Sequence, residues 1–185
     1  MSLHIRPLTA TDAPAYKALR DESLRSAPEA FTSDWASSVE RDASEYAARF
    51  GSVASGRFFL GAFGDAGHLL GCIGCERKAR LQQRHCASVV SMMVVPGAQR
   101  RGIGQALVAA CIEAAVQVPG LTQLVLTVTA SNAHVVRLYE HAGFRAWGLL
   151  PRAIVVDGVG YDKLHMLRLL TSAADQGGQS EPPAA

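Results

Sequence analysis

A glycine- and arginine-rich turn between two apolar segments has the composition of an anion-binding site. The apolar, β-branched run that begins at Val89 is stopped by Pro96 and Gly97, and a helical pattern follows. Arg100 and Arg101 lie directly before that pattern. The free N–H groups at the start of a helix, together with the helix dipole, attract an anion. The residue types therefore predict a site for phosphate or pyrophosphate at this junction.

Two known phosphate-binding loops do not fit this stretch. The P-loop needs the string Gly-x-x-x-x-Gly-Lys-Ser/Thr, which the sequence does not contain. A dinucleotide-binding loop needs a third glycine where Leu107 stands. It also needs an acidic residue about 20 positions further on, where the chain has Gln123 and Leu124. Both alternatives fail on these residues.

Residues 99–104, with the sequence Gln-Arg-Arg-Gly-Ile-Gly, resemble the acyl-CoA-binding signature Gln/Arg-x-x-Gly-x-Gly/Ala of the GNAT superfamily of N-acetyltransferases. Residues 132–144 are similar to that superfamily's motif Asn-x-x-Ala/Val-x-x-Leu-Tyr-x-x-x-Gly-Phe, and the two motifs occur in the expected order. The matched segments cover residues 88–148. The resemblance implies that acetyl-CoA is the co-substrate of this chain.

The same resemblance implies roles for individual residues. Backbone amides of the loop would hold the pyrophosphate, and the main chain of the preceding strand would contact the pantetheine and the thioester oxygen. Tyr139 matches a tyrosine near the sulfur that can act as general acid, although its spacing from Val135 also suits a core residue. Asn132 matches a residue that often contacts the cofactor, and it equally suits a helix start. The implied cofactor-binding residues are Met92, Met93, Val94, Gln99, Arg100, Arg101, Gly102, Ile103, Gly104, Gln105, Asn132 and Tyr139.

The sequence leaves the general base open. Many relatives carry a carboxylate on the central strand or its neighbour, but here residues 88–92 read Ser-Val-Val-Ser-Met. Glu76, His85 or a water relay could take the proton, and the amine could also arrive neutral from solvent. Cys86 and Cys111 could act as nucleophiles only in principle, because each lies in a stretch that looks structural. The favoured hypothesis is direct attack in a ternary complex, without an acyl-enzyme.

Hydrophobic periodicity predicts the elements that must position these residues. Helices are predicted at about residues 12–25, 35–50, 103–118 and 132–142. Thr11 or Asp12 is expected to cap the first helix, and Ser131 the last. Strands are predicted at residues 4–8, 57–63, 68–78, from near 85 to 95, at 121–129 and, as a hairpin turning at 157–158, at 144–169.

The predicted order of elements is β-α-α-β-β-β-α-β-α-β-β. Hairpins alternate with crossover helices in this order, so the sheet should be mixed. The succession matches what the resemblance implies, an α/β (α+β) GNAT fold with a splayed, largely antiparallel sheet of about seven strands and about four helices. We expect residues 1–170 to form a single acetyltransferase domain. Residues 171–185 lack core-forming side chains and are expected to be a disordered tail.

Composition limits the classes of partner. The formal charge of +2 is too small to indicate nucleic acid as the main partner. The basic cluster Arg77, Lys78, Arg80 and Arg84 is interpreted as a solvated hairpin tip, with steering of an anionic ligand as the alternative. The apolar runs are shorter than the ~20 residues of a membrane span, and the N-terminus lacks signal-peptide features. We therefore expect a cytoplasmic protein without a membrane partner.

The four cysteines include one Cys72-x-x-Cys75 pair. A zinc site would need a second pair or histidines at ligand spacing. On a strand, positions 72 and 75 face opposite sides. We therefore expect reduced thiols and no metal.

The leading hypothesis is an N-acetyltransferase whose acceptor is a primary amine of a small molecule or of a protein or peptide. The alternative is a non-catalytic acyl-CoA-binding or regulatory module on the same fold, which the missing strand carboxylate favours. Asp34, Glu40 and Asp162 are candidates to hold a cationic amine, with surface solvation as the simpler explanation. Homodimers are common in the superfamily, so the resemblance makes a homodimer a candidate assembly for this chain.

Overall fold

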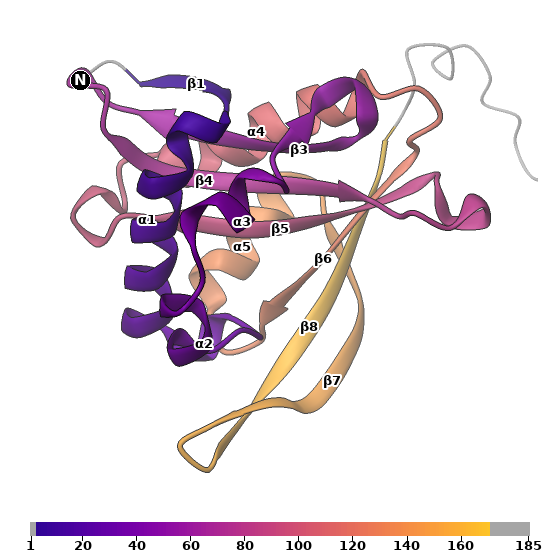
Figure 1. The fold of residues 1–185 in the computed structure, drawn as a ribbon. Helices are drawn as coiled ribbons and strands as arrows, with labels where there is room; N and C mark the ends of the chain where they lie inside the picture. Colours follow the sequence, from indigo (N-terminus) through magenta and orange to yellow (C-terminus); the bar gives the residue numbers. More distant parts are fainter. Residues whose placement is uncertain (1–2, 171–185) are drawn as a thin grey trace, which may run out of the picture.

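The computed structural model describes residues 3–170 as an α/β fold built on one sheet (Figure 1). The helices are α1 (Ala13–Ser26), α2 (Trp35–Val39), α3 (Ala43–Ala47), α4 (Ile103–Val116) and α5 (Ala133–His141). The strands are β1 (His4–Pro7), β2 (Gly51–Ser52), β3 (Arg57–Phe63), β4 (Leu69–Arg77), β5 (Cys86–Val94), β6 (Gln123–Thr129), β7 (Arg145–Val156) and β8 (Val159–Leu169). The predicted fold class is confirmed, and the predicted elements follow one another in the expected order, with β2 as an additional strand and with the second predicted helix divided into α2 and α3.

The sheet is mixed, as expected from the alternation of hairpins and crossovers. Its strand order is β1-β3-β4-β5-β6-β8-β7, with β2 paired to β3. Every pairing is antiparallel except that of β5 with β6. The eighth strand is the two-residue β2, which lies in a segment of small residues where no strand was predicted.

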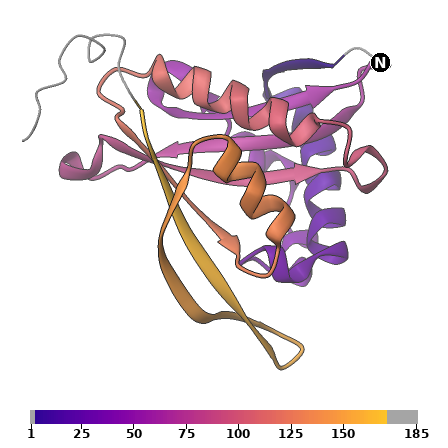
Figure 2. The same ribbon diagram turned by 180° about the vertical axis from the view of Figure 1, so that it is seen from behind.

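Helices cover both faces of the sheet. Helices α1, α2 and α3 lie on one face (Figure 1), and α4 and α5 lie on the other (Figure 2). Each layer has its own buried cluster, because side chains alternate between the two faces along each strand. Cys72 belongs to the α1 cluster and Cys75 to the α4 cluster, so the predicted opposite orientation is confirmed. All four cysteines are free thiols.

Two predictions about helix ends are wrong for the same physical reason. The helix expected at 35–50 is two helices, because the Asp42 side chain accepts a hydrogen bond from Ser44 N and starts α3 anew. Helix α5 is capped by Asn132, whose side chain accepts from Val135 N at 3.3 Å, and not by Ser131. A short polar side chain competes for the helix N–H groups wherever the backbone lets it reach them.

The helices of the described residues include none that is long and apolar enough to cross a membrane. The assignment of residues 1–170 to a single domain stays a prediction. The expected disordered tail, 171–185, lies outside the described residues.

Candidate active site

The two central strands diverge at the middle of the sheet. Strand β5 pairs with β6 only through residues 86–88 and 123–125. Beyond this point β5 stays with β4, and β6 stays with β8 (Figure 1). In an antiparallel pair, every second residue points its N–H and C=O away from the partner strand. Residues 89–94 of β5 therefore turn part of their main-chain donors and acceptors toward a side where β6 no longer pairs with them.

Strand β5 also bends within this stretch. Ser91 and Met92 lie opposite the single residue Ile73 of β4, because the register of the two strands shifts there. Ser91 has a φ of 53°, which is unusual for a residue with a side chain. A bulge of this kind turns the following backbone groups in a new direction and is common beside active sites. It lies directly before Met93 and Val94, in the segment predicted to contact the thioester.

Side chains from two other elements hold the bulge. The Tyr16 hydroxyl of α1 donates to Ser91 Oγ at 3.2 Å. The Cys72 thiol of β4 donates to the Ser91 carbonyl at 3.3 Å. The strained conformation of Ser91 is thus fixed from the α1 side of the sheet.

The loop before α4 has the conformation of an anion site. Gly102, the residue that caps α4, has a φ of 78° and a ψ of −2°, and Arg100 also has a positive φ, 60°. No backbone acceptor within residues 3–170 is recorded for the N–H groups of Ile103 and Gly104. A Cβ placed on Gly102 would meet no atom within 4 Å, so this backbone is open to an incoming group. The loop therefore fits a diphosphate bound through main-chain N–H groups.

The second glycine of the motif has a different purpose. A Cβ on Gly104 would lie 3.0 Å from Met92 Cε and 3.5 Å from Leu138 Cδ2. Gly104 thus lets the first turn of α4 pack closely against β5 and α5. Gln99 Nε2 donates to the carbonyl of Val94 at 3.3 Å, which ties the loop to the end of β5.

Tyr139 lies on α5, the helix that covers the diverging part of β5 and β6 on the α4 face of the sheet (Figure 2). It is 5% exposed and packs edge-to-face on Phe144, with ring centres 5.6 Å apart. Burial, reinforced by the nearby Cys111 thiol, raises the pKa of Tyr139 above its usual value. The phenol therefore stays protonated and can act as a proton donor.

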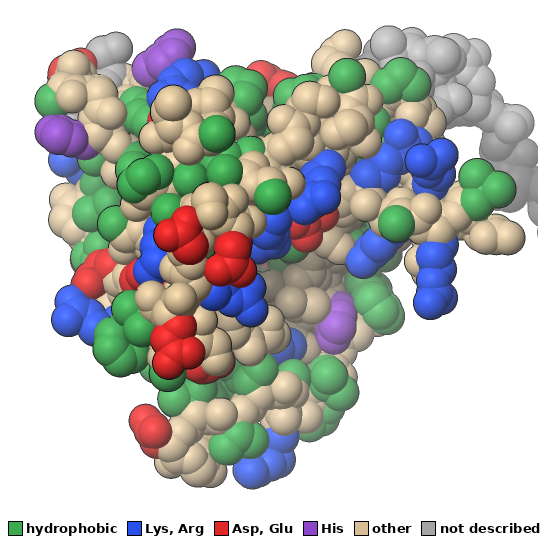
Figure 3. Space-filling model, in the orientation of Figure 1, with side chains coloured by type: hydrophobic (Ala, Val, Ile, Leu, Met, Phe, Trp, Pro, Cys, Tyr) green, Lys and Arg blue, Asp and Glu red, His purple; other side chains and the backbone are tan. Residues whose placement is uncertain are grey.

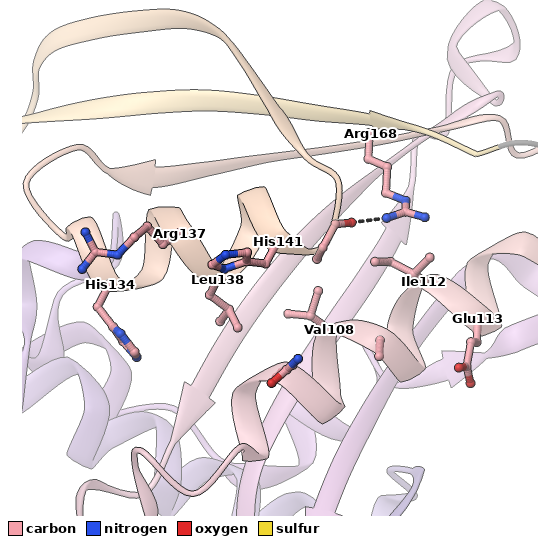
Figure 4. A pocket seen from close by; sticks show the side chains of 11 residues that line it. Val108, Ile112, Glu113, His134, Arg137, Leu138, His141 and Arg168 are labelled. Atoms are coloured by element: carbon pink, nitrogen blue, oxygen red, sulfur yellow. Dashed lines mark hydrogen bonds between the residues drawn. The ribbon is translucent and has the colours of Figure 1, made fainter.

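A groove of ≈ 580 Å³ runs between α4 and α5. The residues that line it are Gln105, Val108, Ala109, Ile112, Glu113, His134, Arg137, Leu138, His141, Ala142 and Arg168. His134 and Arg137 lie at one end of the groove, and Arg168, which donates to the Ala142 carbonyl, lies at the other (Figure 4). Because Gln105 and His134 belong to the first turns of α4 and α5, the groove opens beside the anion loop.

A comparison with family models decides the family. The model described as the acetyltransferase (GNAT) family matches residues 17–144. The chain belongs to this family. The sequence motifs at residues 99–104 and 132–144 both lie inside the matched region.

Solved structures of the family share the fold along the whole domain. A GCN5-related N-acetyltransferase from Kribbella flavida is 27% identical, with a TM-score of 0.78 over 91% of this chain and 98% of its own. The protein yncA from Salmonella typhimurium, solved with its cofactor acetyl-CoA, is 21% identical, with a TM-score of 0.75 over 100% of both chains. A GNAT superfamily phosphinothricin acetyltransferase from Sinorhizobium meliloti, in complex with acetyl-CoA, is 20% identical, with a TM-score of 0.77 over 99% of this chain and 97% of its own. No curated protein matches the chain.

The structure distinguishes between Glu76 and His85, the two side chains that the sequence offers as the general base of this GNAT enzyme. Glu76 of β4 lies opposite Ser88, the last β5 residue that pairs with β6. Its Oε1 accepts hydrogen bonds from Arg49 Nη2 at 2.9 Å and from Arg49 Nε at 3.3 Å. His85 is exposed and precedes β5, at the end where the strands are closed. Glu76 is therefore the candidate beside the divergence, and His85 is not.

The other acidic candidates do not gather near this point. Asp34 caps α2 by accepting from Ser37 N at 2.7 Å, and Asp162 accepts from Arg152 N at 2.8 Å. Glu40 is exposed at the end of α2. Within residues 3–170 no group of three or more His, Cys, Asp or Glu side chains is placed to hold a metal ion.

Three buried polar residues of the α1 face were not singled out from the sequence. Tyr16 and Arg20 lie one turn apart on the buried side of α1, and Lys163 lies within β8. The available signal was a polar residue on an otherwise apolar stripe, which is uncommon without a partner or a function.

Proposed function

We propose that the protein transfers the acetyl group of acetyl-CoA to a primary amine of a small molecule or a peptide. The observation that carries this proposal is the divergence of β5 and β6, with the anion loop at the end of β5 and Tyr139 behind the gap in pairing. Acetyl-CoA in the yncA and Sinorhizobium meliloti structures supports the choice of co-substrate. The amine would attack directly in a ternary complex.

The residues that would hold acetyl-CoA are main-chain groups above all. N–H groups of residues 100–105 would bind the diphosphate, and the β5 backbone at Met92, Met93 and Val94 would follow the pantetheine. The side chain of Asn132 already caps α5, so we assign its contribution to shaping the start of that helix. When bound, acetyl-CoA supplies the acetyl group as an activated thioester.

Three groups of the chain would take part in the reaction. An N–H re-aimed by the bulge would donate to the carbonyl oxygen, an interaction of about 3 kcal/mol in other acyl transfers. The Tyr139 phenol would donate its proton to the departing sulfur. Glu76, directly or through a water molecule, would take the proton of the amine while Arg49 keeps its carboxylate in place.

Acceptor-stimulated thiol release tests the proposal. The purified protein is incubated with acetyl-CoA and a broad amine panel, and free CoA thiol is followed. We expect release that depends on particular amines. Binding of acetyl-CoA without such release across the panel would instead support the non-catalytic acyl-CoA-binding module.

The groove between α4 and α5 should recognise the 3′-phosphate of CoA. Arg137 is exposed near its open end, together with His134. Arg137→Ala should weaken CoA binding about five- to tenfold and leave dephospho-CoA binding unchanged, because only CoA carries the charge that Arg137 would bind. Calorimetry with both ligands measures this. Arg145→Ala, at an exposed position at the start of β7 that does not line the groove, is the matched control. An equal loss for both ligands would contradict the assignment.

The β7–β8 ribbon supports a homodimer. It projects from the body of the molecule (Figure 1), and Trp147, Leu149, Leu150, Val155 and Val159 are each more than half exposed on it. Strand β7 is also an edge strand with an unpaired side. We predict that light scattering gives twice the 19.6 kDa chain mass. Leu149→Lys should yield monomers, whereas Val116→Lys on α4 should not. A monomeric wild-type protein at high concentration would refute the dimer.

A cytoplasmic location belongs to the same proposal. The four cysteines are all unpaired, which suits a reducing compartment. Trapping the thiols in intact cells under denaturing conditions should find them reduced, and disulfide-linked thiols would contradict this location.

A further inference from the structure

Arg20 is a buried guanidinium on the sheet-facing side of α1. The residue is 9% exposed, its Nη2 donates to Ser33 Oγ at 2.9 Å, and its Cζ lies 5.8 Å from the centre of the Tyr46 ring. Its Nε is buried and has no hydrogen-bond partner among the described residues. A buried charge with an unsatisfied donor is unfavourable. We therefore expect an acceptor from outside the described residues to bind Arg20.

The carboxylates of residues 3–170 do not neutralise Arg20. The ion pairs recorded in this range are Arg6–Asp12, Lys17–Asp21, Arg25–Glu22 and Arg49–Glu76. Asp21, the next residue in the chain, is held by Lys17 Nζ at 2.5 Å and by Ser38 Oγ at 2.8 Å. Arg20 is therefore a buried cation without a carboxylate partner in this part of the chain, an exception among proteins.

The guanidinium lies near the bend of β5. Tyr16, one helical turn before Arg20, donates its hydroxyl proton to Ser91 Oγ at the bulge. Burial raises the pKa of Tyr16, and the positive charges of Arg20 and Arg49 oppose that rise. The Tyr46 ring, 5.8 Å from Arg20 Cζ, lies 5.4 Å from the Tyr16 ring, so Arg20 belongs to the same cluster as the hydroxyl that contacts the bulge. Of the two arginines, only Arg49 has a carboxylate partner within residues 3–170, that of Glu76.

The segment that contacts Arg20 through Ser33 is attached to β6 and β8. Lys163 of β8, 4% exposed, donates from Nζ to the carbonyls of Ala30 at 3.0 Å and Glu29 at 3.3 Å, and to Thr129 Oγ1 of β6 at 2.8 Å. These bonds attach the chain just before Ser33 to β6 and β8. Figure 3 shows this face of the molecule hollowed between the helices and the β7–β8 ribbon. Arg20 thus lies between the β5 bulge and a segment anchored on β6.

We propose that the acceptor is a small amine that carries its own carboxylate, and that Arg20 binds this carboxylate. The proposal rests on the proposed acetyl transfer and names its substrate class. A guanidinium binds a carboxylate through charge-assisted hydrogen bonds, and the buried Nε supplies a donor for one of them. Because Arg20 is close to the Tyr16–Ser91 contact, carboxylate and reacting amine would belong to one compact molecule, such as an α-amino acid.

Acceptors that differ only in their carboxylate test whether Arg20 binds that group. Each amino acid is compared with its amide and its decarboxylated amine, with thiol release from acetyl-CoA as the readout. For the preferred acid, kcat/KM should exceed that of both analogues without a carboxylate by about 100-fold or more, because their binding leaves Arg20 unpaired. In Arg20→Gln this preference should fall to about tenfold or less with the KM of acetyl-CoA unchanged. Arg25→Gln, on the exposed side of the same helix, should behave as wild type.

A binding measurement keeps the test independent of turnover. N-acetyl amino acids, the products of the proposed reaction, should protect the wild-type protein and Arg25→Gln against thermal unfolding. Their amides should not, and neither compound should protect Arg20→Met. Without ligand, Arg20→Met should unfold at the same or a higher temperature than wild type, because it removes an uncompensated buried charge.

Several outcomes would overturn the assignment. These are efficient acetylation of amines without a carboxylate, equal use of longer peptides (a protein N-terminus as acceptor), absence of protection by any acid, or destabilisation of Arg20→Met in the absence of ligand. If no acceptor of any kind supports thiol release, the proposed transferase function fails. The protection assay would still decide whether Arg20 binds a carboxylate.

Discussion

Replacing Tyr139 by phenylalanine is expected to lower kcat by about 100- to 10,000-fold, the usual contribution of a positioned acid. The hydroxyl is the only group removed, and the aromatic ring can keep its edge-to-face contact with Phe144. Acetyl-CoA affinity and the free energy of unfolding should therefore change little. Stopped assays of thiol release, with calorimetry of acetyl-CoA binding, separate loss of chemistry from loss of binding.

The pKa of Tyr139 gives this prediction a second test. Burial raises the pKa above its usual value of 10.0, so the phenol stays protonated throughout the range from neutral pH to that value. Loss of the Tyr139 proton should therefore not reduce the wild-type kcat as the pH rises through this range. Tyr161→Phe, on β8 and half-buried, is the matched control. If Tyr139→Phe has the wild-type kcat, Tyr139 is a core residue and not the general acid.

The motif residues could be predicted from the sequence because their requirements are local. Gly102 must adopt a left-handed conformation to cap α4, and the turn before it needs Pro96 and Gly97 to end a strand. The buried stripe of α5, including Tyr139, follows from helical spacing. Even here the sequence did not distinguish the role of Gly104 from that of Gly102. Gly104 is required for close packing against Met92 and Leu138, which belong to other elements of the fold.

The features that depend on distant pairings could not be predicted. The β5–β6 pairing stops after three residue pairs, and the bulge at Ser91 exists only relative to β4. A tally of apolar residues gives a strand but not its register. For the same reason the sequence could not rank Glu76 above His85, because their positions relative to the divergence are set by the sheet. Arg20 was not recognised because its missing partner is a property of the packed structure.

A glutamate at Gly102 should weaken binding of CoA and acetyl-CoA by about 100-fold or more. A carboxylate about 5 Å from a bound diphosphate is repelled by about 3 kcal/mol per unit charge at the effective dielectric constant of a protein surface. The side chain itself fits, because a Cβ at this position meets no atom within 4 Å. Calorimetry at up to millimolar CoA measures the loss.

Two control variants separate charge from backbone strain. Gly102→Ala imposes the same left-handed conformation, φ 78°, without a charge, and should cost about 1–2 kcal/mol of stability with a much smaller loss of affinity. Gly158→Glu adds the same side chain at another open, left-handed glycine, φ 79°, in the β7–β8 turn, and should bind CoA as wild type does. Equal affinities for Gly102→Glu and Gly102→Ala would mean that the diphosphate does not lie at this helix start. The backbone groups of β5 and Tyr139 would then have no thioester delivered to them, because the loop is what fixes the position of the cofactor along the diverging strands.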